Sequence, residues 1–376
     1  MKFASNASHR QVPKVKPWLT LIRVLMALLC ISFTGGCHPS PSKSEGSSEA
    51  TSREAESKEA LPNIIPTNYK VTSIAHHTHC CDGSAGVALD ERHFLVANDE
   101  NSILRIYPRG EGSKPIDEVN VRKFLDLKKK DDESDLEGMT RIGNRVFVIA
   151  SHARSKDGDK RKGRRQLFAL NYTNSNGTPG LTPYGEPYTK LLKDLENSYL
   201  FEGVDFDAAA KKPGDDRDGL NIEGLTSTPD GGLMIGFRHP IHQGATLLVT
   251  IQNPEEVVLG EKPRFSKGLK LLLGGMGIRG LERHHSTYFL TTESTQGKRY
   301  PQIFAWNGVD ERPKRIFATL PKDLNPESIV IFPDTGTKEL HILSDDGNEK
   351  IAGDPCNEID EKEDRSFRRV VLKAAP

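Results

Sequence analysis

Short apolar runs recur along the chain from about residue 84 onward, and each is bounded by polar residues together with Gly, Asp, Asn or Pro. The runs are rich in Val, Ile, Leu, Phe and Thr, which are residue types that favour β-strands. Stretches with helical periodicity are few, and the clearest lies at residues 188–195. The pattern of apolar and polar positions therefore predicts an all-β domain.

One four-residue pattern occurs five times with the same neighbours. Each copy carries a small residue in its third position, and it is followed by a polar turn and by an apolar strand that ends in polar residues. A further strand follows the first four copies, whereas the fifth is followed only by a weak match near Lys350. The five copies are residues 84–87, 136–139, 222–225, 278–281 and 326–329.

The spacing of these copies indicates the architecture. Their small residues are separated by 52, 86, 56 and 48 positions. A unit of four strands that repeats at about fifty residues is typical of a β-propeller. We therefore predict a propeller of five four-stranded blades over residues 61–376. The 86-residue interval leaves two interpretations open, a degenerate sixth blade or a lid-like insertion. An open β-sandwich is the alternative fold, but it does not explain the repeat.

The two ends of the domain are expected to meet. The C-terminal strand at residues 368–373 can complete a blade together with N-terminal residues, as in many closed propellers. Two of the five cysteines lie within residues 1–37, which are interpreted below as an export signal with a lipid anchor. The other three are Cys80, Cys81 and Cys356. We expect Cys356 to pair with Cys80 or Cys81, and the alternative is three free thiols.

Six short motifs occur in a fixed order within the repeats. They are residues 135–138, 151–154, 221–225, 236–240, 274–279 and 343–347. With these motifs the chain resembles an uncharacterised bacterial family known only as a domain of unknown function, number thirty-six sixteen. The resemblance covers roughly residues 80–350. It implies a propeller-like fold and transfers no catalytic residue.

The N-terminus has the features of an export signal. A basic stretch that ends at Arg23 precedes an apolar run at residues 24–33, which is too short to span a bilayer as a helix. Residues 34–37 then resemble a bacterial lipobox with Cys37 as the lipid anchor, although Thr34 stands where Leu is usual. Ordinary cleavage near this point is the alternative. We therefore expect a lipoprotein-type signal at residues 1–37 and an extracytoplasmic protein anchored to a bacterial membrane, in the periplasm or on the outer surface.

Composition and charge limit the classes of partner that we expect. Residues 38–60 are rich in Ser and Glu with few apolar residues, and they predict a disordered tether. The chain carries 52 basic and 52 acidic residues, but residues 1–37 hold five basic and no acidic ones, so the remainder has a net charge of about −5. This balance argues against a nucleic-acid binder. We expect a monomer that contacts the membrane only through its lipid.

Alignment of the repeats places charged residues at two equivalent positions of successive blades, so that both sets face the axial tunnel. The first column is Ala85, Glu137, Glu223, Arg279 and Glu327. The second column, at the ends of the following strands, is Asp99, His152, Arg238, Glu293 and Asp346. Asp135, Asn221 and Asn325 precede three members of the first column by two residues and point the same way in an extended strand.

A ring of inward carboxylates is costly unless protons, arginines or a cation neutralise it. Carboxylate oxygens are hard ligands that suit Ca²⁺ or Mg²⁺. The expected ligands of such an ion are Glu137, Glu223, Glu327 and Asp346. The alternative is a structural ring in which the glutamates pair with Arg238 and Arg279 and hold the blades together.

The same residues favour a hydrolase. A cation-held water, a carboxylate base and a cationic group over the developing charge would hydrolyse a small phosphoester, ester or lactone. The candidate catalytic residues are Glu137, Glu223, His152, Arg238 and Arg279. The alternative is a non-catalytic binding module, in which a propeller face and its loops recruit a protein or glycan partner.

Two other segments carry chemistry-bearing residues. Residues 76–82 combine imidazoles and thiols, which suit Zn or Cu, but their spacing matches no strong metal motif. An exposed loop with one disulfide cysteine is the other interpretation. The basic run at residues 156–165 suits phosphate or anionic lipid, or forms a solvated hairpin loop.

Overall fold

The structure is a computed structural model that describes residues 66–128, 133–294 and 301–375. Of the two units into which the chain divides, residues 1–60 and 61–376, only the second contains described residues. The predicted export signal, the anchor Cys37 and the tether at residues 38–60 lie outside the described part. Within that part no helix is both long and apolar enough to cross a membrane.

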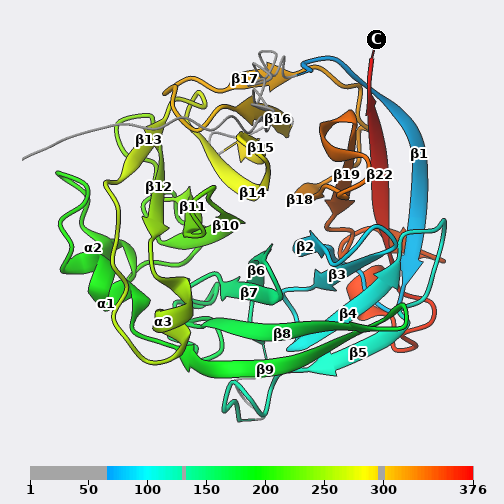
Figure 1. Cartoon of the computed structure of the whole chain (residues 1–376), viewed down its shortest axis with the longest axis horizontal. Helices are drawn as coiled ribbons and strands as arrows, with labels where there is room; N and C mark the ends of the chain where they lie inside the picture. Colours follow the sequence, from blue (N-terminus) through cyan, green and yellow to red (C-terminus); the bar gives the residue numbers. More distant parts are fainter. Residues whose placement is uncertain (1–65, 129–132, 295–300, 376) are drawn as a thin grey trace, which may run out of the picture. The chain divides into compact units, whose positions relative to one another are not determined.

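Five four-stranded antiparallel sheets form the blades of a β-propeller around a central axis (Figure 1). Blade 1 comprises β2 (Ala85–Ala88), β3 (His93–Ala97), β4 (Ile103–Pro108) and β5 (Asp117–Asn120). Blade 2 comprises β6 (Leu136–Ile142), β7 (Arg145–Ala150), β8 (Leu167–Ser175) and β9 (Thr178–Tyr188). Blade 3 comprises β10 (Asn221–Ser227), β11 (Leu233–His239), β12 (Thr246–Ile251) and β13 (Leu269–Leu271).

The remaining blades complete the ring. Blade 4 comprises β14 (Met276–His284), β15 (Thr287–Ser294), β16 (Gln302–Trp306) and β17 (Lys314–Ile316). Blade 5 comprises β18 (Pro326–Val330), β19 (Glu339–Ser344), β22 (Ser366–Ala374) and β1 (Tyr69–Thr78). The strands β2, β6, β10, β14 and β18 lie nearest the axis (Figure 1). The predicted all-β propeller with five four-stranded blades is confirmed.

The long interval between the second and third repeats does not form a sixth blade. It contains the extended β8–β9 hairpin, the short helices α1 (Leu191–Glu196) and α2 (Phe206–Ala209), and a loop that leads to β10. The apolar faces of both helices are buried in the cluster that fills the space between blades 2 and 3. Another short helix, α3 (Pro254–Val258), packs against the same cluster. The part of the interval between β9 and β10 is therefore an insertion that is anchored to these two blades.

The small residues of the repeat permit close packing between blades. A Cβ atom at Gly138 of β6 would lie 2.8 Å from the Cβ of Leu225 in β10. A Cβ at Gly224 of β10 would lie 2.9 Å from Ile278 Cγ2 in β14. Real Cβ atoms do not approach other atoms this closely, so glycine is required where neighbouring innermost strands converge.

The hydrophobic core is divided among the interfaces between neighbouring blades. Each of the five clusters of buried apolar residues in the described part draws its side chains from two adjacent blades. No blade therefore has a core of its own, and the fifth interface exists only if blade 5 packs against blade 1. That interface is aromatic, with Phe94 and Tyr107 of blade 1 packed against Phe332 and Phe367.

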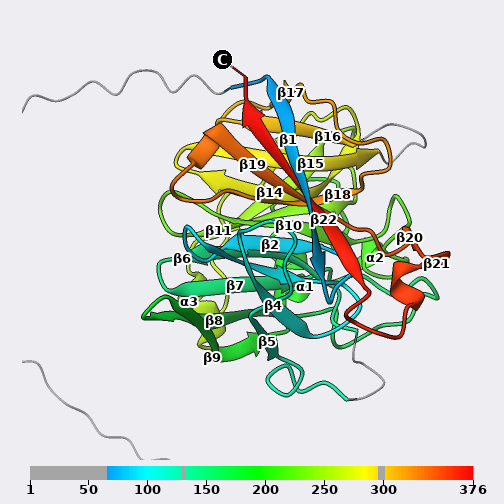
Figure 2. The same cartoon turned by 90° about the vertical axis from the view of Figure 1, so that its right-hand side faces the viewer.

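Both ends of the domain lie in blade 5 (Figure 2). Strand β1 pairs antiparallel with β22, with Tyr69 opposite Ala374, and β22 also pairs with β19. The predicted closure by residues 368–373 is confirmed. The weak repeat near Lys350 instead forms a small hairpin of β20 (Lys350–Ile351) and β21 (Asp354–Pro355).

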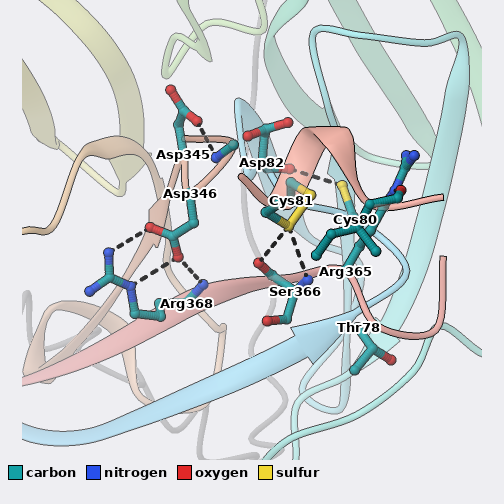
Figure 3. The surroundings of a disulfide bond; sticks show 12 residues. Thr78, Cys80, Cys81, Asp82, Asp345, Asp346, Arg365, Ser366 and Arg368 are labelled. Carbon is teal, nitrogen blue, oxygen red and sulfur yellow. Dashed lines mark hydrogen bonds and ion pairs between the residues drawn. A yellow bond between two sulfur atoms is a disulfide. The ribbon is translucent and has the colours of Figure 1, made fainter. Parts of the chain in front are cut away.

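A disulfide joins Cys81, just after β1, to Cys356 in the 3₁₀ helix η3 (Cys356–Glu358) (Figure 3). The other 3₁₀ helix, η2 (Gly336–Lys338), precedes β19. The expected pairing of Cys356 is confirmed, and of the two candidate partners it is Cys81. Cys80 is a free, buried thiol whose Sγ donates to the carbonyl of Asp82 at 3.0 Å. Within this domain the bridge closes a loop of 275 residues, beside the seam between blades 5 and 1.

Cys356→Ser is expected to lower the free energy of unfolding by about 2–5 kcal/mol, because a disulfide that closes a long loop restricts the unfolded chain. Urea unfolding with and without dithiothreitol measures this effect. Dithiothreitol should destabilise the wild-type protein and leave Cys356→Ser unchanged, since the variant has no bridge to reduce. An equal effect of dithiothreitol on both proteins would contradict the prediction.

Candidate functional site

A polar cavity of about 590 Å³ opens where the innermost strands β6, β10, β14 and β18 begin. Ten acidic and five basic side chains line it, so its formal charge is strongly negative. They come from the innermost strands and from loops at the ends of the blades. The cavity therefore collects charged side chains from all five blades.

The first charged column coincides with β-bulges. The register between β6 and β7 shifts at Glu137, which has no partner residue in β7. The same kind of shift occurs at Glu223 in β10, at Arg279 in β14 and at Glu327 in β18. A bulge leaves one residue out of the ladder and re-aims its side chain. All four side chains line the cavity, and the bulges account for their common direction.

Glu223 lies between two arginines. Arg238 Nη1 donates to Glu223 Oε1 at 2.7 Å, and Arg279 Nε lies 3.0 Å from Glu223 Oε2. Arg279 also forms an ion pair with Glu327. Burial of Glu223 favours the neutral form, but the charges of Arg238 and Arg279 prevail and hold its pKa below the ordinary value. The ion pairs thus connect blades 3, 4 and 5 and keep Glu223 ionised.

Glu137 occupies the equivalent position in blade 2 but has the opposite environment. Burial raises its pKa well above the ordinary value, and the negative charges of Glu223 and Asp135 raise it further. The positive charge of Arg279 opposes this shift less strongly. The surroundings of Glu137 therefore favour its protonated form, whereas those of Glu223 in the neighbouring blade favour the carboxylate.

Carboxylates on the loops extend the acidic wall. Arg164 Nη1 lies 2.8 Å from Asp135 Oδ2, yet burial still raises the pKa of Asp135 to about 6. Burial, followed by the charges of Asp135 and Asp345, raises the pKa of Asp99 to about 7. Burial, assisted by the repulsion between neighbouring carboxylates, thus raises the pKa values along this wall.

A second carboxyl pair closes the wall beside the disulfide. Burial and the facing carboxylate of Asp345 raise the pKa of Asp82 to about 10. Burial of Asp345 acts in the same direction, but hydrogen bonds from Asp82 and from the amide of Gly347 hold its pKa below the ordinary value. In the absence of a cation this pair shares one proton, which resides on Asp82.

Four of the five candidate catalytic residues meet in the cavity, namely Glu137, Glu223, Arg238 and Arg279. His152 does not line it. The imidazole is buried, its Nδ1 donates to the carbonyl of Ala150 at 2.8 Å, and burial lowers its pKa to about 4. Its φ of 58° places it in the left-handed region, so its side chain does not follow the alternation of the strand before it.

The four predicted metal ligands are separated by their partners. Glu223 and Glu327 both face Arg279, whereas Asp346 accepts hydrogen bonds from Arg368 at 2.7 Å and does not line the cavity. Across residues 66–128, 133–294 and 301–375, no three Asp, Glu, His or Cys side chains are grouped closely enough to hold a metal ion. A Ca²⁺ or Mg²⁺ ion on these four residues stays a prediction. The side chain of Glu293, from the second column, lies outside the described part.

Sequence reasoning missed several cavity residues, among them Asp82, Arg164 and Asp345. Asp82 lay in the segment interpreted as a His- and Cys-rich loop, and Arg164 lay in the basic run interpreted as a hairpin loop. Asp345 is the neighbour of the predicted Asp346. The signal for Asp345 was its position immediately after an apolar strand in a two-aspartate motif, but the pattern alone does not say which aspartate points inward.

Glu223→Gln is expected to lower the free energy of unfolding by about 3–5 kcal/mol, because it leaves two partly buried arginines without their shared carboxylate. Glu327→Gln is the matched control and should cost less, since Arg279 keeps Glu223. The stabilisation from ionised Glu223 is fully present above about pH 4.5 and is lost as the pH falls towards its lowered pKa. Urea unfolding between pH 3 and 8 measures both effects, and equal losses in the two variants would contradict this assignment.

Several solved structures are similar to this chain at low identity. The extracellular domain of a hybrid two component system from B. thetaiotaomicron matches with 12% identity and a TM-score of 0.31, over 70% of this chain and 25% of that chain. YCF48 bound to D1 peptide matches with 13% identity and a TM-score of 0.27, over 70% of this chain and 60% of that one. This chain thus spans about a quarter of the first protein and 60% of the second.

A GH43_1 enzyme from Xanthomonas citri matches with 10% identity and a TM-score of 0.43, over 78% of this chain and 89% of that chain. At these scores none of the three structures transfers an activity. No curated protein matches the sequence.

A family match covers more than half of the chain. Residues 83–175 and 189–335 match in two segments, which together extend from the start of blade 1 into blade 5. The gap between the segments, residues 176–188, falls on β9 and the turn before it. The resemblance drawn from the six sequence motifs is confirmed. The chain belongs to the family described as "Protein of unknown function (DUF3616)".

Proposed function

We propose that this protein is an exported, lipid-anchored hydrolase of a small, uncharged polar substrate, with Glu137 as its general acid and Glu223 as its base or nucleophile. The observation that carries the proposal is the contrast between the environments of these two glutamates. They occupy equivalent bulges in adjacent blades and line one cavity, yet Arg238 and Arg279 contact Glu223 directly. Two carboxyl groups whose environments separate their pKa values are the usual basis of acid and base roles.

Each residue then has a distinct role. Protonated Glu137 can donate a proton to a leaving oxygen, and ionised Glu223 can attack the reacting carbon or activate a water. Arg238 and Arg279 act through Glu223, because they keep it ionised and fix its orientation. His152 has no part in this scheme, since its ring is held by the carbonyl of Ala150.

The charge of the cavity limits the classes of substrate that can enter it. With twice as many acidic as basic side chains, the wall repels anions, so a phosphoester would enter only together with a cation. Esters and lactones, two of the classes expected from the sequence, are neutral and fit better. Neutral glycosides join them, because a carboxylic acid and a carboxylate on either side of the scissile bond are the usual means of cleaving a glycosidic bond.

A non-catalytic binding module is the second candidate, and the ion pairs favour it. Glu223, Arg279 and Glu327 connect three successive blades, which is a sufficient structural reason for their presence. Residues Arg154 and Lys156 of the basic loop and Asp215 of the insertion also line the cavity. Under this alternative, these loops recruit a protein or glycan partner.

Export and lipid anchoring rest on the N-terminal sequence. The basic stretch, the short apolar run and Cys37 together supply a lipoprotein-type signal. The disulfide between Cys81 and Cys356 supports this address, because such bridges persist in oxidising compartments. The domain is then a monomer that is held at a bacterial membrane by its lipid.

Glu137→Gln is expected to abolish hydrolysis while the protein stays folded. Gln has nearly the shape of the neutral acid but has no proton to give, so kcat/KM should fall by about 10²- to 10⁴-fold. Chromogenic esters, lactones and glycosides are assayed beside p-nitrophenyl phosphate, with and without Ca²⁺. Asp215→Asn, an exposed change on the same cavity, is the matched control and should keep its activity.

The pH profile of this activity should be bell-shaped. Activity falls at low pH as Glu223 takes up a proton, and at high pH as Glu137 loses its own. Full activity in Glu137→Gln would refute the acid–base assignment. Absence of turnover on every neutral substrate, combined with tight binding of a glycan or protein, would favour the binding module.

Cys37→Ser is expected to release the protein from the membrane. In a bacterial expression host, the wild-type chain should be found in the membrane fraction and be labelled by a palmitate analogue. The variant should lose the label and appear in the soluble extracytoplasmic fraction. Equal labelling of both chains would exclude Cys37 as the anchor.

A further inference from the structure

Asp82 is a buried carboxyl group that accepts no hydrogen bond from the described part of the chain. It follows Cys81 after strand β1, and the residue is only 3% exposed. Among the described residues, no hydrogen-bond donor reaches either of its carboxylate oxygens. Yet the side chain lines the polar cavity. Burying an uncompensated carboxylate is costly, so this position requires either a proton or a cation.

Asp345 faces Asp82 from the other end of the chain. The two residues form an isolated antiparallel bridge, which connects the segment after β1 to the segment after β19. The Asp345 carboxylate is fixed in place, because it accepts the amide of Gly347 at 2.9 Å and Asn325 Nδ2 at 2.9 Å. Two carboxyl groups thus face each other, and the hydrogen bonds to Asp345 fix the position of one of them.

Gly347 packs closely against both carboxylates. A Cβ atom added to Gly347 would lie 2.7 Å from Asp82 Oδ1 and 3.3 Å from Asp345 Oδ1. Gly347 has no left-handed φ, so glycine is required here for the space rather than for the backbone conformation. Asn348 and Asn357 line the same cavity.

The neighbouring Asp346 is not part of this arrangement. Figure 3 shows its carboxylate turned toward Arg368, away from the carboxylates of Asp82 and Asp345. Asp99 resembles Asp82 in two respects. Its Oδ1 is also buried without a hydrogen-bond partner in the described part, and it lines the same cavity.

We propose that Asp82 and Asp345 bind one divalent cation, preferentially Ca²⁺, beside the disulfide that closes the ring. Ca²⁺ takes six to eight oxygen ligands in flexible geometry, and it combines carboxylates with amide oxygens and water. Two carboxylates from the protein therefore suffice when Asn348, Asn357 and water supply the remaining oxygens. The ion replaces the shared proton and neutralises both charges.

This site differs from the metal site expected from the sequence, which used Glu137, Glu223, Glu327 and Asp346. It does not depend on the proposed hydrolysis, because none of its ligands belongs to the acid–base pair. Its position gives it a structural role, since it would join the first and last segments of the domain at the point where Cys81 and Cys356 are already bonded.

Calorimetric titration of the full-length chain in detergent, after treatment with EDTA, tests the proposal with CaCl₂ and MgCl₂ as probes. One Ca²⁺ should bind per chain, more tightly than Mg²⁺, and should raise the melting temperature. Asp82→Asn should weaken the affinity by at least about tenfold, because even changes outside the ligand shell commonly cost 10- to 100-fold. This variant resembles the protonated state of Asp82 and is expected to fold.

Gly347→Ala and Glu327→Gln complete the experiment. Gly347→Ala keeps both carboxylates but places a methyl group against Asp82 Oδ1, so it should displace this carboxylate and also weaken binding, whereas Glu327→Gln should bind like the wild-type protein. Loss of binding in Glu327→Gln but not in Asp82→Asn would show that the ion binds at the first charged column, and it would overturn the proposal. Absence of both heat and a melting shift with either ion would also overturn it, and would leave Asp82 and Asp345 as a proton-sharing pair.

Discussion

The burial of negative charge at the axis of the ring is the constraint on which the rest of the structure depends. A propeller brings equivalent positions of successive blades together, so a carboxylate repeated in the sequence becomes a cluster of carboxylates in space. Such a cluster is unstable unless each charge is balanced. In this protein arginine balances Glu223 and Glu327, whereas burial raises the pKa of Glu137 and favours its neutral form. Each form of compensation has a different chemical consequence.

Closure of the ring makes this arrangement possible. Because every apolar cluster lies between two blades, opening any interface would expose a large part of the core. The seam between blades 5 and 1 is the vulnerable one, since it joins chain segments that are far apart in sequence. Pairing of β1 with β22, the aromatic cluster around Phe94 and the disulfide all act there. The same seam places Asp82 opposite Asp345, so the wall of the cavity depends on closure as much as the core does.

The repeat in the sequence was enough to predict the blades and the inner column. Gly138 and Gly224 mark the points where innermost strands converge, so they align whenever the blades align. Side-chain direction after a strand was not predictable. His152 adopts a left-handed conformation and turns to the backbone, and Asp345 rather than Asp346 points inward. These outcomes depend on one dihedral angle or on a distant partner such as Arg368, and neither leaves a local pattern in the sequence.

The bulges explain why side chains of the first charged column both form ion pairs between blades and line the cavity. Blade 1 has Ala85 in this column, and its pairing with β3 shows no register shift there, so it contributes neither a charge nor a re-aimed side chain. The column therefore holds three glutamates but only one arginine. Arg279 lies between Glu223 and Glu327, and Arg238 adds a second cation to Glu223. Glu137 has no such partner among the described residues, and burial together with the negative charge of Glu223 raises its pKa. Equivalent bulges thus hold one glutamate whose ionised form is favoured by arginines and one whose protonated form is favoured by burial, and the proposed acid and base roles rest on this difference.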